Sequence, residues 1–179
     1  MSTQKSVRQE FGTVEENPVR FDREKAEQIV EALNTDLAAT YVLYHQLYKH
    51  HWNVEGAQYR DLHLFFEEAA KDAQEGADEI AERIQALGGV PISGPAAMED
   101  HSPVEFEGEH VYDIRTSLEH DLEMYGDIIE TVREHVDLAA SLGDHATAQI
   151  LREQLVVLED YAHEVEHFLE HDSLTEYHA

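Results

Sequence analysis

The chain has 179 residues, with 39 acidic against 12 basic side chains, a formal net charge of −27 and no cysteine. This length suits a single domain with a substantial core. The lack of cysteine excludes thiolate zinc sites and iron–sulfur clusters. Because DNA binding depends on cations that displace phosphate counterions, so acidic a surface is expected to repel nucleic acid.

Hydropathy and charge also indicate where the protein works. No apolar run is long enough to cross a membrane, and the N-terminus has no apolar stretch typical of a signal peptide. We therefore expect a cytoplasmic protein. Scarce lysine beside abundant carboxylate fits a halophilic cytoplasm, where molar salt screens self-repulsion, and the same charge can draw in cations such as Fe(II). A disordered acidic chain is not expected, because 42% of the residues are hydrophobic and recur at helical spacing.

The N-terminal part of the chain predicts a tail followed by a helix. Residues 1–20 lack periodicity and contain Pro18, which favours a flexible tail. Asp22 is a plausible N-cap for a helix that continues to about Asn53. Its apolar side is expected to consist of Ile29, Leu33, Leu37, Tyr41, Tyr44 and Tyr48.

A second helix is expected from Tyr59 to Leu87, interrupted only by the tolerated Gly76. It divides into three faces, which suggests three environments: core, subunit interface, and solvent or an enclosed cavity. The core face is formed by Leu62, Phe66, Ala69, Ala73, Ile80, Ile84 and Leu87. An acidic row is formed by Glu68, Asp72, Glu75 and Glu79.

The remaining pattern predicts a crossover and two more long helices. Residues 90–108 are rich in proline and glycine, and residues 96–100 can form a short helix within them. A third helix has an apolar stripe made of Val111, Ile114, Leu118, Leu122, Tyr125, Ile129, Val132 and Val136. Gly143 ends it, Asp144 caps a fourth, and that helix continues to about His171. We expect an all-α, ferritin-like four-helix bundle over 21–172 with one long crossover, and a C-terminal tail over 173–179.

The third face of the second helix carries a candidate metal site. His63 and Glu67 are one turn apart, as are Asp78 and Glu82. At 100° per residue all four fall on one stripe, but the two pairs are about 16 Å apart along the axis. Two such helices can pack antiparallel across a two-fold axis. His63 and Glu67 of one chain would then meet Asp78 and Glu82 of its mate, which gives two equivalent sites per dimer. Small or neutral residues between the pairs would let the helices approach: Ala70, Gln74, Ala77 and Ala81.

The site also has candidates before the second helix and a competing interpretation. His51 and Trp52 lie at the end of the first helix and can cover one side of this metal site. Imidazole and carboxylate ligands suit iron, zinc or manganese. Histidine and acid are so abundant in this chain, however, that a solvated acidic face remains an alternative.

In this region the sequence resembles the Dps family, the mini-ferritins. The matching residues, without a gap, are His51-Trp52-Asn53-Val54, Gly56, Leu62-His63, Phe66-Glu67, Asp78, Glu82-Arg83-Ile84 and Leu87-Gly88-Gly89. The likeness is looser over the rest of the chain, where Thr147 and the Leu158-Glu159 region fall in the expected last helix.

The resemblance implies an iron-storing ferroxidase that protects against oxidative damage. It assigns iron-ligand roles to His51, His63, Glu67, Asp78 and Glu82, with the histidines from one subunit and Asp78 and Glu82 from its two-fold mate. Fe(II) would be oxidised to Fe(III), usually by hydrogen peroxide, and stored in a hollow homo-dodecameric shell. The cavity-facing nucleation sites would be Glu68, Asp72 and Glu75.

Two departures from the family pattern stand out. His163 occupies the place of a tryptophan found in many members, and the lysine-rich tail with which some members bind DNA is not matched. We therefore do not expect DNA binding. The other functional classes considered are a DNA-compacting protein and a helical bundle without metal chemistry.

Three further groups have open interpretations. His163, His167 and His171 form an i, i+4, i+8 row that can line an ion access path, hold surface zinc, or simply be solvated. Glu164 and His167 form a Glu-x-x-His motif, but the second motif needed for a di-iron site within one bundle is missing from the second helix. Asp137 and Asp144 can ring a three-fold pore or be ordinary surface acids.

Overall fold

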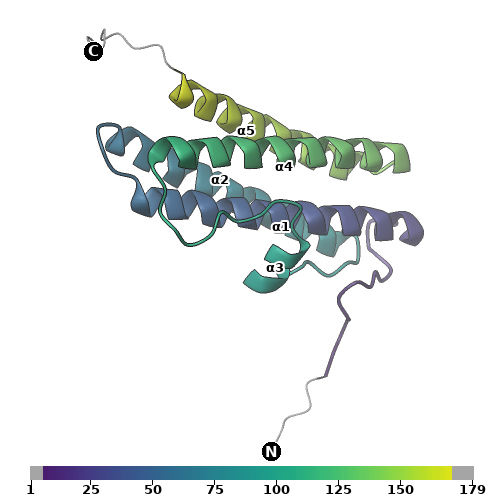
Figure 1. Cartoon of the computed structure of the whole chain (residues 1–179). Helices are drawn as coiled ribbons and strands as arrows, with labels where there is room; N and C mark the ends of the chain where they lie inside the picture. The colour runs from purple at the N-terminus through teal and green to yellow at the C-terminus, as the bar shows by residue number, and fades with distance from the viewer. Residues whose placement is uncertain (1–5, 171–179) are drawn as a thin grey trace, which may run out of the picture.

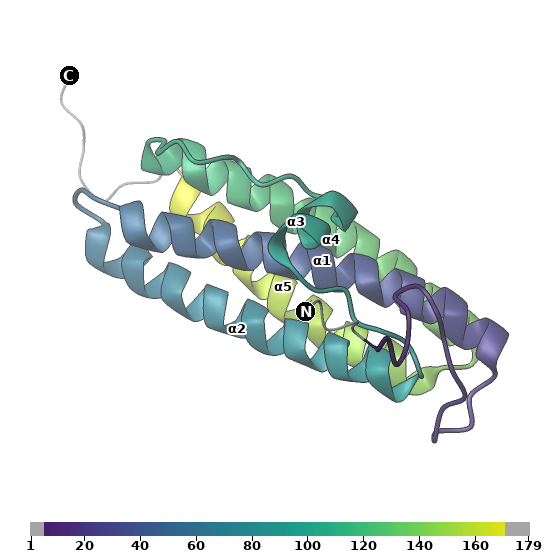
Figure 2. The ribbon, with the colours of Figure 1, turned by 90° about the horizontal axis from the view of Figure 1, so that it is seen from below.

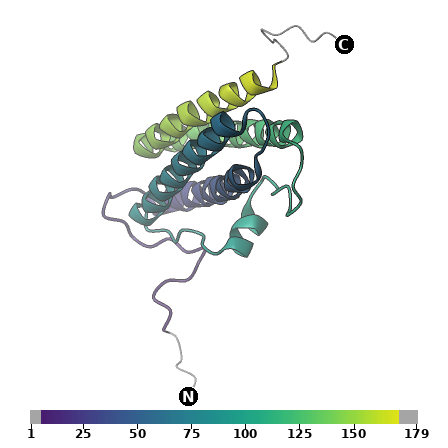
Figure 3. The same ribbon diagram turned by 90° about the vertical axis from the view of Figure 1, so that its left-hand side faces the viewer.

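Five helices make up the part of the chain that this computed structural model describes, residues 6–170. In chain order they are α1 (Arg23–Asn53), α2 (Tyr59–Ala86), α3 (Pro95–His101), α4 (Ile114–Leu142) and α5 (His145–Leu169). The antiparallel pair α1–α2 packs on the antiparallel pair α4–α5 (Figures 1 and 3). The crossover from α2 to α4 carries α3, which lies outside the bundle against α1 (Figure 2). The predicted all-α four-helix bundle with one long crossover is confirmed.

Three aspartates fix where three of the four long helices, α1, α4 and α5, begin. Asp22, Asp113 and Asp144 each accept a hydrogen bond from the backbone N–H three residues on, at 3.0–3.1 Å. Such a bond satisfies one of the amide groups that the first helical turn leaves without a partner. Gly143 ends α4 in the left-handed region at φ 87°, which glycine adopts without steric cost.

The core lies between the two helix pairs. Its largest fully buried side chains include Phe66 of α2 and Tyr125 of α4. The predicted apolar row of α1 is buried as far as Leu37, whereas Tyr41, Tyr44 and Tyr48 are only partly buried against the core. No helix among residues 6–170 is long and apolar enough to cross a membrane.

At Gly76, α2 comes close to α5. This residue is buried, and a Cβ atom there would meet the side-chain amide of Gln154. The amide is the flexible end of a side chain and can turn away, so Gly76 is tolerated, as the sequence suggested, at a point of close helix contact.

Within the predicted flexible tail over 1–20, the described residues 6–20 make contacts with the bundle. Val14 is buried, the side-chain amide of Gln9 donates to the carbonyl of Gly88 at 2.8 Å, and the backbone N–H of Glu15 donates to the same carbonyl at 2.9 Å. These contacts tie the segment to the end of α2. The sequence did not predict them, because neither a single apolar residue such as Val14 nor hydrogen bonds to the distant Gly88 produce a periodic pattern.

The start of α4 also differs from the prediction. Val111 lies before the helix and is exposed, because the cap at Asp113 starts the helix at Ile114. At the same end of the bundle α5 stops at Leu169, whose carbonyl accepts a hydrogen bond from Arg115 of α4 at 3.2 Å. The predicted helix end at His171 and the tail over 173–179 lie outside the described residues.

Candidate metal centre

The two predicted histidines meet where α1 ends and α2 begins. Their rings stack with centroids 3.8 Å apart and planes inclined by 20°. Nδ1 of His51 lies 2.8 Å from the backbone carbonyl of His63, and Nδ1 of His63 lies 3.0 Å from the carbonyl of His51. A carbonyl can only accept, so each Nδ1 carries the proton and donates it. In the neutral ring, each Nε2 atom then keeps a free lone pair, the form in which imidazole binds a metal.

Aromatic side chains surround this histidine pair. Tyr59 stacks on His63 at 5.1 Å, and Tyr48 lies edge-on to His51 at 5.7 Å. Trp52 is 5.8 Å from Tyr48 and 70% exposed. Together with Tyr59, which is also exposed, it leaves apolar surface uncovered beside the histidines.

Glu67 lies one turn beyond His63 and is ionised. Its carboxylate is 2.7 Å from the ammonium group of Lys71. The hydrogen bond and charge of Lys71 hold the pKa of Glu67 below its usual value, and His51 and His63 act in the same direction. The carboxylate is thus available as a ligand, with Lys71 as a partner that a metal ion would displace.

The other two predicted ligands are not brought to the histidines within one chain. Asp78 and Glu82 are exposed further along α2, and 11 residues of helix separate Asp78 from Glu67, or about 16 Å. Over residues 6–170 no three His, Asp or Glu side chains are arranged to hold one metal ion. A single chain therefore presents two imidazoles and a carboxylate at one end of α2 and two carboxylates at the other.

The stripe of small residues expected between these two ends needs correction. Ala70 and Ala77 are fully buried in the chain's own core, one and three turns after Phe66. Only Gln74 and Ala81 of that set reach the outer face, as an exposed and a half-buried residue. The small-residue surface that α2 can offer to another helix is correspondingly shorter than predicted.

The acidic row of α2 is mostly solvent-exposed. Glu68 and Glu75 have open side chains, whereas Asp72 is half-buried and accepts a hydrogen bond from the hydroxyl of Tyr161 at 2.6 Å. Burial and the nearby Asp72 carboxylate raise the pKa of Tyr161 far above its usual value, so that the hydroxyl stays a donor. Asp72 is accordingly less free to bind a metal than its two neighbours in the row.

Two other acidic candidates separate in the structure. Asp137 is exposed, as either of its interpretations requires. Asp144 is buried, caps α5, and both of its carboxylate oxygens accept from Nη2 of Arg83, at 2.7 and 2.9 Å. The suggestion that Asp144 lines a pore or is a surface acid is therefore wrong: its carboxylate is occupied inside the chain. Glu164 and His167 are both exposed, so they do not form a di-iron site in the bundle core.

Comparison with known proteins places this geometry in a family. A model of the ferritin-like domain matches residues 30–175. The chain is 61% identical to the DNA protection during starvation protein of Halobacterium salinarum, over 97% of this chain and 96% of that one. It is 38% identical to a nutrient stress-induced DNA-binding protein of Nostoc, over 98% and 95%.

Solved structures agree. An archaeal Dps homologue from Halobacterium salinarum superposes with a TM-score of 0.94 at 60% identity, covering 98% of each chain. The chain belongs to the Dps family. Dps from Vibrio cholerae, described as a member of a superfamily of ferritin-like diiron-carboxylate proteins, superposes with a TM-score of 0.81 at 25% identity, covering 86% of this chain and 96% of that one.

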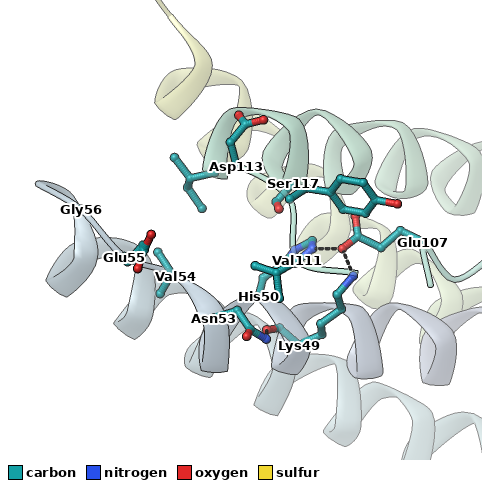
Figure 4. A pocket seen from close by; sticks show the side chains of 12 residues that line it. Lys49, His50, Asn53, Val54, Glu55, Gly56, Glu107, Val111, Asp113 and Ser117 are labelled. Atoms are coloured by element: carbon teal, nitrogen blue, oxygen red, sulfur yellow. Dashed lines mark hydrogen bonds and ion pairs between the residues drawn. The ribbon is translucent and has the colours of Figure 1, made fainter. Parts of the chain in front are cut away.

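This Dps chain also contains a buried polar network that the sequence analysis missed. His50, directly before His51, has Nδ1 2.7 Å from a carboxylate oxygen of Asp121. Its Nε2 lies 2.7 Å from a carboxylate oxygen of Glu107 (Figure 4). Lys49 donates to the same Glu107 oxygen at 2.5 Å, and Nδ1 of His120 lies 2.5 Å from the other. The network joins α1 and α4 to the crossover, and it holds the end of α1 that carries His51.

Opposing effects set the protonation of this network. Burial lowers the pKa of His50, but Asp121 and Glu107 outweigh it and raise that pKa above its usual value. Burial raises the pKa of Glu107, but hydrogen bonds from Lys49, His120 and His50 bring it below its usual value. The only local signal in the sequence is the acid Asp121 within the apolar stripe of α4.

Proposed function

We propose that this Dps-family protein is a ferroxidase and an iron store that limits oxidative damage. The observation that carries the proposal is the paired orientation of His51 and His63, whose Nδ1–H groups are both bound to carbonyls and whose Nε2 atoms are both free. The other predicted ligands, Asp78 and Glu82, lie too far along the same helix to join them. A two-fold mate is the simplest source of the missing carboxylates.

In this proposal Fe(II) binds as a substrate between two subunits. His51 and His63 of one chain face Asp78 and Glu82 of the mate, and Glu67 bridges or holds a second ion. Oxygen anions favour the harder Fe(III), so the carboxylates promote loss of an electron. Hydrogen peroxide accepts two electrons from two Fe(II) ions and two protons from solvent, its O–O bond breaks to give two water molecules, and no hydroxyl radical is released.

Storage follows oxidation in the same scheme. We infer that Fe(III) passes to the exposed Glu68 and Glu75, with Asp72 as a weaker partner because it is bound to Tyr161. The twelve-subunit shell implied by the family resemblance would enclose the mineral.

The shared site makes a specific prediction about mixed assemblies. His63→Ala and Asp78→Ala, each measured alone, should lower the initial rate of Fe(II) oxidation by more than about tenfold, because each removes a ligand from every site. When the two variants are dissociated and reassembled at equal amounts, about half of the dimers are mixed, and each mixed dimer has one intact site. About a quarter of the sites should thus recover activity.

Controls make this test decisive. Glu130→Ala removes an exposed carboxylate on α4, and His145→Ala removes an exposed histidine on α5. Both should oxidise iron at the normal rate. Peroxide is added to anaerobically loaded protein in high salt, and ferric absorbance is followed with native mass. Normal rates in both single variants would refute the site, and no recovery on mixing would refute its sharing between subunits.

DNA binding is the second function to consider, because the Nostoc relative is named a DNA-binding protein. We propose that this chain does not share it, since 39 acidic residues stand against 12 basic ones. A mobility-shift titration with duplex DNA from low to high salt tests this, and a complex that weakens with salt would contradict it.

A further inference from the structure

A histidine pair on α5 lies outside the proposed iron site. His163 and His167 are both exposed, one turn apart, and their Nε2 atoms are 3.0 Å from each other. The ring centroids are 4.3 Å apart. Within residues 6–170 neither ring makes another hydrogen bond. Only one proton fits between two such nitrogens, so at least one Nε2 lone pair is directed into the space between the rings.

This arrangement has the geometry of a two-ligand metal site. Zinc binds histidine nitrogen at about 2.0–2.1 Å, which sets two nitrogens of one tetrahedral ion about 3.3 Å apart. The observed separation needs only a small rotation of the rings to reach that value. Residues 163–167 read HEVEH, and an H-E-x-x-H helix places both imidazoles on one face for the same reason.

The surroundings favour a cation. A carboxylate oxygen of Glu166 lies 3.7 Å from Nδ1 of His163, where its charge favours a proton on Nδ1 and leaves Nε2 free. The pair belongs to the last two turns of α5, the negative end of the helix dipole.

The backbone beneath the pair is held in place. Phe168 packs edge-on against Phe65 of α2 at 5.3 Å, and the buried Val165 joins the core between the two histidines. This end of α5 lies at the end of the bundle where α1 turns into α2 (Figure 1). Ion binding would therefore order side chains on an already fixed helix.

We propose that His163 and His167 bind one divalent late transition-metal ion, of the zinc or copper class, through their Nε2 atoms. Among residues 6–170 no third protein ligand is arranged beside the pair, so the proposal rests on these two imidazoles alone. Imidazole pairs bind copper and zinc more tightly than Fe(II), so this site differs from the iron site in metal preference. It does not depend on the proposed function.

The test uses the assembled full-length protein without a tag. His51→Ala/His63→Ala serves as the background, so that the proposed iron site does not bind the probe metal. Zn²⁺ is titrated by calorimetry, and Cu²⁺ loading is followed by electron paramagnetic resonance. We expect one zinc ion per chain and a copper signal with coupling to two nitrogens. Adding His163→Ala or His167→Ala should weaken zinc binding by more than about tenfold.

His145→Ala in the same background is the matched control, as an exposed histidine at the other end of α5. It should leave both signals unchanged. Zinc isotherms that overlay with and without His163, or a copper signal that lacks nitrogen coupling, would overturn the proposal. Both variants replace exposed side chains, and circular dichroism verifies that the helix content is unchanged.

Discussion

Replacing Glu107 with glutamine tests how strongly the buried network holds the crossover to the bundle. The Glu107 side chain is 5% exposed and accepts contacts from Lys49, His50 and His120. Removing one partner of a buried ion pair costs about 3–5 kcal/mol, because the other charge stays buried without compensation. Glutamine keeps the shape and one acceptor, so part of the contact survives the change.

The surroundings of Lys49 reduce the loss further. Its ammonium group lies 5.5 Å from the ring centre of Phe106 and 5.2 Å from that of Tyr112, contacts worth about 0.5–2 kcal/mol. We therefore expect Glu107→Gln to lower the free energy of unfolding by about 2–4 kcal/mol. For a chain of this size that corresponds to a fall in Tm of about 5–15 °C.

The assay is thermal and guanidinium unfolding followed by circular dichroism. Protein concentration is held constant, because assembly contributes to apparent stability. Glu105→Gln, an exposed carboxylate on the same segment, should change stability by less than about 0.5 kcal/mol. Lys49→Met combined with Glu107→Gln should cost less than the sum of the single changes, with a coupling of about 0.5–3 kcal/mol.

The pH dependence provides an independent check. The pKa of Glu107 is lower in the folded state than its usual 4.5, so its contribution is present above that pH and lost as the pH falls through the folded value. The difference between wild type and Glu107→Gln should therefore shrink below about pH 4.5. Equal stability of the Glu105 and Glu107 variants, or strict additivity with Lys49→Met, would refute this account of the network.

Three further predictions concern the helix ends and the α1–α4 contact. Gly143→Ala should destabilise by about 1–2 kcal/mol in guanidinium unfolding through its left-handed backbone alone, since the space around it is open, and an unchanged midpoint would argue against that conformation. Asp144→Ala removes both the α5 cap and the buried partner of the partly buried Arg83, and should cost about 3–5 kcal/mol at pH 7; a loss of only about 1 kcal/mol would leave the cap as its sole role. Burial lowers the pKa of His135, but its 2.8 Å contact with buried Asp36 outweighs this and raises the pKa. Stability should therefore fall as the pH rises above about 6.5, and His135→Gln should make this slope shallower in unfolding curves at stepped pH, while His50, whose pKa is also raised, keeps the rest. An unchanged slope would contradict the contact.

Local signals in the sequence predicted most of the backbone correctly. Asp22, Gly143 and Asp144 start or end helices where expected, because caps and left-handed glycines act on the nearest turn alone. The pairing of His51 with His63 was also anticipated, since only a short turn separates the two helices. Helical periodicity did not predict the burial of Ala70 and Ala77. An idealised helical wheel places both near the border of two faces, whereas the structure buries them in the core.

Long-range polar contacts lay beyond what such patterns can predict. His50 is 57 residues from Glu107 and 71 from Asp121, and no spacing rule connects side chains at those separations. The cap at Asp113 excluded Val111 from α4 although its periodicity fitted. Whether Asp78 and Glu82 meet the histidines of a mate is a question of assembly, which a single chain's pattern can suggest but not determine.

The carbonyl-bound histidines at the α1–α2 turn have a consequence for how cargo can come and go. In a zinc finger the metal creates the fold, so releasing the ion means unfolding the domain. Here the backbone itself orients both rings, and the helices that carry them are fixed by the core. Binding of an ion between such rings costs little side-chain conformational entropy, because the rings are already ordered. Release of the ion leaves the fold intact. This architecture suits reversible binding of an ion, with repeated loading and release, rather than permanent retention.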